Sequence, residues 1–180
     1  KQANYTLTTT SATTTGSISA RPVTVTADAQ SKTYGDADPA FVYTFTPALI
    51  TGDTFSGSLT RDAGEDAGTY AIKQGSLALS NNYALTYTGA ELTIGKKSIA
   101  VTASAKSKIY GTADPALTYT FAPALAGSDA FSGSLTRDAG ESPGSYAINQ
   151  GTLALSNNYI LDYTNASLTV TNAALTVTVQ

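Results

Sequence analysis

An internal repeat of 76 residues constrains the fold of this chain more than any other feature of its sequence. The dipeptide Tyr34-Gly35 returns as Tyr110-Gly111 (110 − 34 = 76), and the stretch FSGSLTRDAGE at residues 55–65 returns unchanged at residues 131–141. The two copies align without a gap. Because each copy of such a repeat forms one structural unit, the chain is predicted to form two similar β-rich modules, at residues 21–96 and 97–172.

The two ends of the chain continue the same register. Residues 174–179 (ALTVTV) resemble residues 98–103 (SIAVTA), and Asn4-Tyr5 resembles Asn82-Tyr83. We therefore expect residues 1–20 to be the tail of a preceding repeat and residues 173–180 to be the start of a following one. The chain is then expected to be one part of a longer array of modules.

The pattern of apolar residues within one copy predicts strands. Val23, Val25 and Ala27 alternate with polar residues, as in a half-buried strand that we extend to residue 29. Gly, Pro and Asn mark the turns that separate the other segments rich in β-branched and aromatic residues. These segments predict further strands at residues 41–45, 58–61, 68–72, 76–79, 83–87 and 91–94.

The predicted fold class is mainly β, with two small modules end to end. The segment Pro47–Gly52 has proline near its start and glycine at its stop, which favours one or two helical turns. A module with that short helix would be β-grasp-like, which is our prediction. The alternative is an immunoglobulin-like β-sandwich, favoured by six or seven short strands and a final hairpin.

The composition argues against several classes of function. The chain has no Cys, Met, Trp or His, which removes thiolate nucleophiles, Cys/His zinc sites and His-based general base catalysis. Its net charge is −3, without a basic patch for nucleic acid, and no apolar run is long enough for a membrane span. We expect a protein that is not an enzyme, needs no cofactor or metal, and binds no nucleic acid.

The repeated stretch FSGSLTRDAGE is the first candidate for a chemical site. Arg61 with Asp62 and Glu65 could bind an anion or a sugar. The alternative is that Arg61 pairs with a nearby carboxylate while the Asp-Ala-Gly turn joins two strands. We favour that structural interpretation, and an exposed pair of this kind contributes only about 0–1 kcal/mol.

Two further candidates involve Asp and Lys residues. Asp36, Asp38 and Asp53 suggest calcium, but Asp36 is replaced by Thr in the second copy, so turn or cap roles are favoured. Lys32 or Lys108 could form an internal isopeptide crosslink with an Asn, which needs a buried Lys–Asn–acid triad. Since Lys32 lies beside a predicted turn, we expect it to be exposed instead.

The module resembles the MBG-type domain of the YGX class, found in the stalks of large secreted bacterial adhesins. The residues that carry the resemblance recur in both copies: Tyr34–Pro39, Gly57–Arg61, Gly68–Ile72 and Asn82-Tyr83, then Tyr110–Pro115, Gly133–Arg137, Gly144–Ile148 and Asn158-Tyr159. The resemblance covers nearly all of the chain. It implies a spacer in a fibrillar adhesin and no catalytic or cofactor residue.

Together these observations predict structural stalk repeats of an extracellular bacterial surface protein. Only Gly95–Ser98 separates the two modules, so bending between them should be restricted. The expected partners are neighbouring repeats of the same chain, with host or biofilm glycans bound through other regions of the parent protein. The chain should be a monomer and should not insert into membranes. The alternative is an array of carbohydrate- or mucin-binding modules, which exposed aromatic grooves in both copies would favour.

Overall fold

A computed structural model describes residues 15–177 of the chain, and these residues form strands and turns without a helix. The prediction of a mainly β fold is confirmed. The first module contains β1 (Arg21–Ala27), β2 (Gln30–Thr33), β3 (Tyr43–Thr46), β4 (Thr60–Arg61), β5 (Gly68–Lys73), β6 (Tyr83–Thr88) and β7 (Ala90–Gly95). The second contains β8 (Lys97–Ala103), β9 (Lys106–Ile109), β10 (Tyr119–Ala122), β11 (Thr136–Arg137), β12 (Gly144–Asn149), β13 (Tyr159–Thr164) and β14 (Ala166–Thr171).

Each module is built from two small sheets. In the first module the strand orders are β3-β1-β6 and β2-β7-β5-β4, and the second module repeats them as β10-β8-β13 and β11-β12-β14-β9. Among the changes of sheet along the chain are those between β1 and β2 and between β6 and β7. The described residues therefore contain no helix that could cross a membrane.

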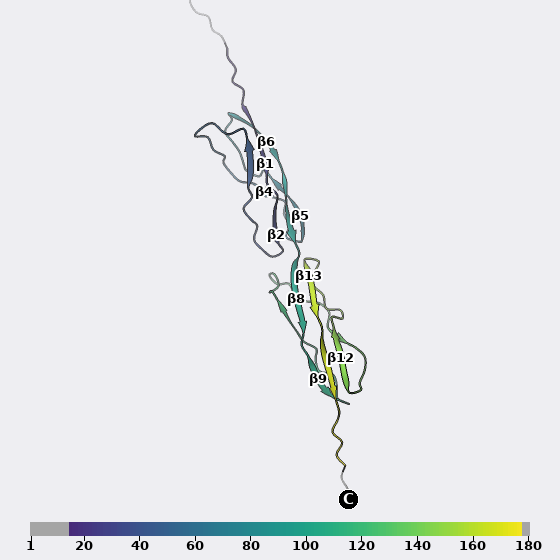
Figure 1. Cartoon of the computed structure of the whole chain (residues 1–180). Coiled ribbons are helices and arrows are strands. Elements are labelled where there is room, and N and C mark those ends of the chain that lie inside the picture. Colours follow the sequence, from purple (N-terminus) through teal and green to yellow (C-terminus); the bar gives the residue numbers. More distant parts are fainter. Residues whose placement is uncertain (1–14, 178–180) are drawn as a thin grey trace, which may run out of the picture.

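The sheet pairing makes each module long and narrow. β6 lies parallel to β1, and β7 lies parallel to β2. The chain therefore runs down the module twice in the same direction, so that β1 starts at one end and β7 finishes at the other. Residues 21–33 alone extend about 40 Å at the usual strand rise. Figure 1 shows the two modules one after the other along a common direction.

The core of the first module comes from the inward faces of its long strands. Val23 and Val25 of β1 and Leu92 and Ile94 of β7 are at most 2% exposed, and they alternate with exposed neighbours as the sequence predicts. Ile99, Val101, Leu168 and Val170 take the same places in the second module. Period-two burial of β-branched and Leu residues thus fixes the register of both modules.

The predicted helix at Pro47–Gly52 is wrong. The segment forms a single turn, in which the Asp53 amide donates to the Ile50 carbonyl at 3.0 Å and Gly52 has φ of +96°. The amide of Ile50 donates to the Tyr83 hydroxyl instead of to a helical carbonyl. A segment of six residues gains too few hydrogen bonds to offset helix nucleation, so a side-chain acceptor decides its conformation.

Two other expectations need correction. Residues 76–79 form no strand, and only an isolated bridge joins Ala78 to Ser56. The last two strands of each module form no hairpin, because β6 pairs with β1 and β7 with β2 in separate sheets. The helix of the β-grasp prediction and the final hairpin of the immunoglobulin-like alternative are therefore both missing from the described residues.

The strands end close to the predicted module boundaries. β7 ends at Gly95 and β8 begins at Lys97, so one residue separates the modules rather than four. Residues 15–20 and 172–177 form no strand. Most of the predicted tail of a preceding repeat (residues 1–20) and the last three residues of the predicted following repeat lie outside the described residues.

Candidate functional site

The arginine of the repeated stretch lies in a compact group of charges. We call Lys32, Asp38, Arg61 and Glu65 the ion-pair cluster of the first module. The Lys32 ammonium contacts Asp38 Oδ1 and Glu65 Oε2, each at 2.7 Å. Arg61 Nε donates to Asp38 Oδ2 at 2.6 Å, and its Nη2 bridges Asp38 and Glu65. Each carboxylate therefore meets both cations, and the four charges cancel.

Arg61 uses all of its hydrogen-bonding capacity inside the module. A guanidinium carries five N–H groups, and five bonds leave this one. Three reach Asp38 and Glu65, and the other two reach the backbone carbonyls of Asp62 and Gly64. The guanidinium also stacks over the Tyr70 ring, 5.3 Å from its centroid. No donor is left for an external anion or sugar, which favours the structural interpretation of the stretch.

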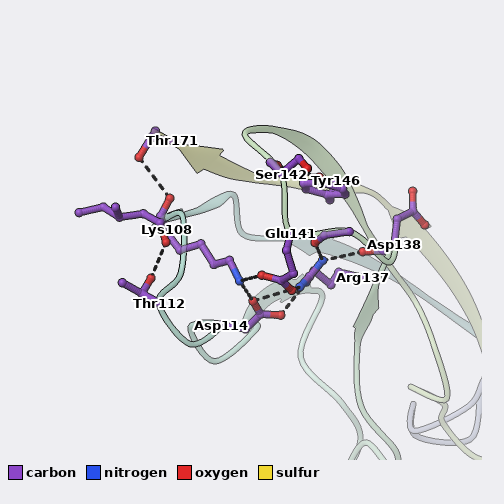
Figure 2. A network of polar contacts seen from close by, with 11 residues as sticks. Lys108, Thr112, Asp114, Arg137, Asp138, Glu141, Ser142, Tyr146 and Thr171 are labelled. Carbon is purple, nitrogen blue, oxygen red and sulfur yellow. Dashed lines mark hydrogen bonds and ion pairs between the residues drawn. The ribbon is translucent and has the colours of Figure 1, made fainter. Parts of the chain in front are cut away.

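The second module repeats the cluster with Lys108, Asp114, Arg137 and Glu141. Figure 2 shows the Lys108 ammonium and the Arg137 guanidinium converging on the same two carboxylates. Arg137 again donates to two carbonyls of its own turn, those of Asp138 and Gly140. Two independent copies of one sequence thus reach the same side-chain geometry.

The lysine of each cluster is buried, so the predicted exposure of Lys32 is wrong. Its side chain is 4% exposed and that of Lys108 is 3% exposed. β2 continues to Thr33, and its alternation points Lys32 inward rather than into the following turn. A buried ammonium needs acidic partners, and Asp38 and Glu65 supply them. Sequence spacing gave no sign of this, because Glu65 lies 33 residues from Lys32.

The charges of the cluster oppose an isopeptide crosslink. Attack on the side-chain amide of an Asn needs a neutral lysine amine and a protonated acid beside it, and it releases ammonia. Hydrogen bonds from Arg61 and then Lys32 lower the pKa of Asp38 to about 2, while those to Asp38 and then Glu65 raise the pKa of Lys32. Both partners stay charged, and the recorded contacts of the Lys32 ammonium are to Asp and Glu rather than to the Asn of the hypothesis.

The depressed pKa values of Asp38 and Asp114 predict a loss of stability in acid. Both are lowered to about 2, against about 3.9 for an unfolded Asp. A depressed folded pKa gives stability that is present above the unfolded pKa and lost as pH falls through the folded one. Urea midpoints should therefore hold steady down to about pH 5 and then fall towards about pH 2. A D38N/D114N double variant should show a shallower slope over that range, and an equal slope would contradict the assignment.

The other residues of FSGSLTRDAGE also have structural roles. Phe55 packs edge to face on Phe45 with ring centroids 5.0 Å apart, and Leu59 belongs to the core. Gly57 has φ of +73°, and a Cβ there would lie 2.1 Å from the Ser76 carbonyl oxygen. An aromatic contact, a close backbone approach, a core side chain and an ion-pair hub thus fall within one stretch. This explains its identity in both copies without a ligand.

The three Asp residues considered for calcium are not brought together as a site. Asp38 is held by Lys32 and Arg61, whereas Asp53 accepts a hydrogen bond from the Tyr83 hydroxyl at 2.6 Å. Asp36 closes the turn that contains Tyr34 and Gly35, where its amide donates to the Thr33 carbonyl. Among residues 15–177 no group of three or more acidic side chains is placed to hold a metal ion.

A second polar site, which sequence reasoning missed, joins the two modules. The Tyr34 hydroxyl donates to Asp129 Oδ2 at 2.9 Å across the joint, and the Tyr159 hydroxyl donates to the same oxygen at 2.7 Å. The rings of Tyr34 and Tyr159 meet edge to face with centroids 5.3 Å apart. Tyr34 therefore packs against the cores of both modules.

A second set of contacts lies beside the tyrosines at the joint. Asn158 accepts a hydrogen bond from the Ala67 amide and donates one to Asp66, each at 2.8 Å. Two surface hollows flank the joint, one lined by Asp66, Ala67 and Asn158 and the other by Tyr34 and Asp129 among others. Together with the Tyr34 contact, these hydrogen bonds restrain rotation as well as bending at the one-residue connection.

A signal for this joint was present in the sequence. Tyr34 lies a few residues beyond the predicted strand that ends at residue 29, and it stands beside Gly35 in a predicted turn, which is an unusual place for a large aromatic residue. Its repetition at Tyr110 suggested only a shared fold. The contact with Asp129 spans 95 residues, which no local pattern can reveal.

The comparisons with known proteins agree with this organisation. A family model described as "MBG domain (YGX type)" matches the chain twice, at residues 23–93 and 99–169. No curated protein matches the chain, and no solved structure does. The two matches together cover most of the chain and coincide with the two modules of the structure. The chain therefore belongs to the MBG (YGX-type) family and carries two of its domains in tandem.

Proposed function

We propose that the two modules are spacer repeats of a bacterial surface adhesin, which hold an adhesive region away from the cell. The observation that carries this proposal is the end-to-end path of the chain. β1 begins at one end of a module and β7 finishes at the other, one residue before β8. A chain built in this way gains length with every module that it adds.

The joint supports the same role. A single linking residue, a shared Asp129 carboxylate and the Asn158 contacts hold the modules in one orientation. A spacer needs this property, because flexible linkers extend only with the square root of their length. Reaction chemistry plays no part in the proposal, since the acids and bases of the clusters are engaged with one another.

An array of weak carbohydrate-binding modules is the second candidate. An exposed phenylalanine at the same place in each module favours it, since Phe45 is 42% exposed and Phe121 43%. Phe55 and Phe131 meet these two rings edge to face, at 65–66°, and Tyr119 is tilted by 47° against Phe121, so the neighbouring rings do not extend a flat platform for a sugar. Binding on a glycan array that is lost in an F45A/F121A variant would favour this candidate over the spacer.

Small-angle X-ray scattering of the chain tests the spacer. A compact protein of this length has a radius of gyration of about 16 Å. Two rigid modules of about 40 Å each, set end to end, should give about 25 Å and a rod-like distance distribution. A radius of gyration near the compact value, or a distribution that only a freely hinged pair can fit, would contradict the proposal.

A further inference from the structure

The two ends of a module carry complementary parts of the joint. We call the turn that contains the Tyr-Gly dipeptide the plug, and the Asp–Tyr pair at the opposite end the socket. In the observed joint the plug is Tyr34-Gly35 and the socket is Asp129 with Tyr159. The repeat places a second plug at Tyr110-Gly111, at the far end of the second module.

The free plug has the shape of the engaged one. Gly111 and Gly35 share the same φ of +85°. A Cβ at Gly35 would lie 2.7 Å from the Cβ of Ala126 across the joint, whereas a Cβ at Gly111 would meet nothing within 4 Å. Tyr110 is 52% exposed, and its neighbour Ile109 is 52% exposed as well. The second module thus presents a preformed turn with an uncovered aromatic and an uncovered aliphatic side chain.

The socket forms without a plug. In the first module the Tyr83 hydroxyl donates to Asp53 Oδ2 at 2.6 Å and accepts from the Ile50 amide at 3.0 Å. The Tyr159 hydroxyl makes the equivalent bonds to Asp129 and Ala126. Asp53 is exposed, whereas Asp129 is partly buried in the joint. A carboxylate oxygen can accept more than one hydrogen bond, as Asp129 Oδ2 does, so a tyrosine can dock on a socket that already exists.

We propose that Tyr110-Gly111 is a docking site for the socket end of a further MBG module in the same polypeptide, and that Tyr110 would donate to that module's socket Asp. The inference rests on the proposed spacer role, since both require modules in line. The argument is continuity with the observed joint: the same dipeptide, the same backbone conformation and the same offset of 76 residues recur at the free end.

The sequence of the second plug also predicts how this docking differs from the observed joint. Asp66 and Ala67, which contact Asn158, are replaced by Ser142 and Pro143. Proline has no amide hydrogen, so the bond from the Ala67 amide has no equivalent. The Tyr110 joint should therefore keep its tyrosine contact but lose part of the restraint on rotation.

The test is a three-module protein, in which a second copy of residues 97–172 follows Asn172 of the full chain without a linker. Residual dipolar couplings report how strongly each module shares the alignment of its neighbour. In the unsubstituted three-module protein, we expect the alignment of the third module to be coupled to that of the second. This coupling should be somewhat weaker than the coupling between the second module and the first. Y110A should uncouple the third module alone, Y34A should uncouple the first from the second, and Y110F should have a smaller effect than Y110A.

The matched control is Y110A in the two-module chain, where alignment and melting temperature should not change because Tyr110 is exposed. If Y110A leaves the third module aligned with the second, the docking role of Tyr110 is overturned while the spacer stands. The inference is also overturned if, in the unsubstituted three-module protein, the third module is uncoupled from the second while the joint between the first and second modules is rigid. Free hinging at both joints of the unsubstituted three-module protein would instead overturn the spacer proposal.

Discussion

Replacing Leu92 by alanine should lower the free energy of unfolding of the first module by about 3 kcal/mol and leave the second module almost unchanged. Leu92 is 0% exposed and lies at the centre of the first core. Its removal opens a cavity in a buried cluster that also contains Ile72 and Ile94. L168A makes the same change in the second module, where Leu168 is also 0% exposed.

The pair of variants is informative because the two cores are separate. Among residues 15–177, Tyr34 is the only apolar side chain packed against buried clusters of both modules, so a cavity in one core has one direct apolar route to the other. Urea titrations followed by amide NMR signals should show two transitions in each variant, with only the mutated module shifted. A single shared transition, displaced equally by L92A and L168A, would show that the modules unfold as one unit.

Replacing Arg61 by alanine should be nearly as damaging, at about 2–3 kcal/mol. The change removes five hydrogen bonds and leaves Asp38 and Glu65 with Lys32 as their one cation within the cluster. It also frees the carbonyls of Asp62 and Gly64, so the turn of the repeated stretch loses its internal support. Thermal unfolding of the first module, followed by the same NMR signals, measures the effect.

A matched control for R61A is available on the surface of the same module. Lys73 pairs with Asp62, but both side chains are about half exposed, so K73A should change stability by no more than about 1 kcal/mol. The loss of stability in R61K should fall between those of R61A and K73A. An ammonium keeps the positive charge but cannot reproduce the planar set of N–H donors of a guanidinium. If R61A behaves like K73A, the cluster contributes no more than an ordinary surface pair.

The sequence predicted the strands well because their burial alternates. β1, β5, β6 and β7 all lie within two residues of their predicted bounds, whereas β2 was not predicted. Core positions such as Val23 and Ile94 follow from the same period. The segment Pro47–Gly52 was mistaken for a helix since its end signals also suit a single turn, and a distant tyrosine hydroxyl decides between them.

The sites were harder to predict than the strands. Arg61 was predicted to pair with a nearby carboxylate, and Glu65, four residues along the chain, is one of its partners. Asp38 and Lys32 reach the same cluster through the fold. The place of Lys32 beside a predicted turn suggested an exposed side chain, because its two acidic partners were not apparent from the sequence. Predicting the joint requires the arrangement of two modules as well as the fold of one, since Tyr34 donates to a carboxylate of the other module. Long-range polar contacts leave no periodic trace in a sequence.

The parallel pairing of β1 with β6 and of β2 with β7 has a consequence for a molecule under tension. In the first module the two strands at the start of the chain, β1 and β2, lie alongside the two at its end, β6 and β7. The paths pair over six residue pairs in one sheet and over four in the other. A pull on the two ends of the module therefore slides these paths past each other, and the backbone hydrogen bonds are loaded together rather than opened one at a time. Rupture under force depends on the unfolding rate, and this shear geometry gives each module a high mechanical threshold along the axis on which it would be stretched.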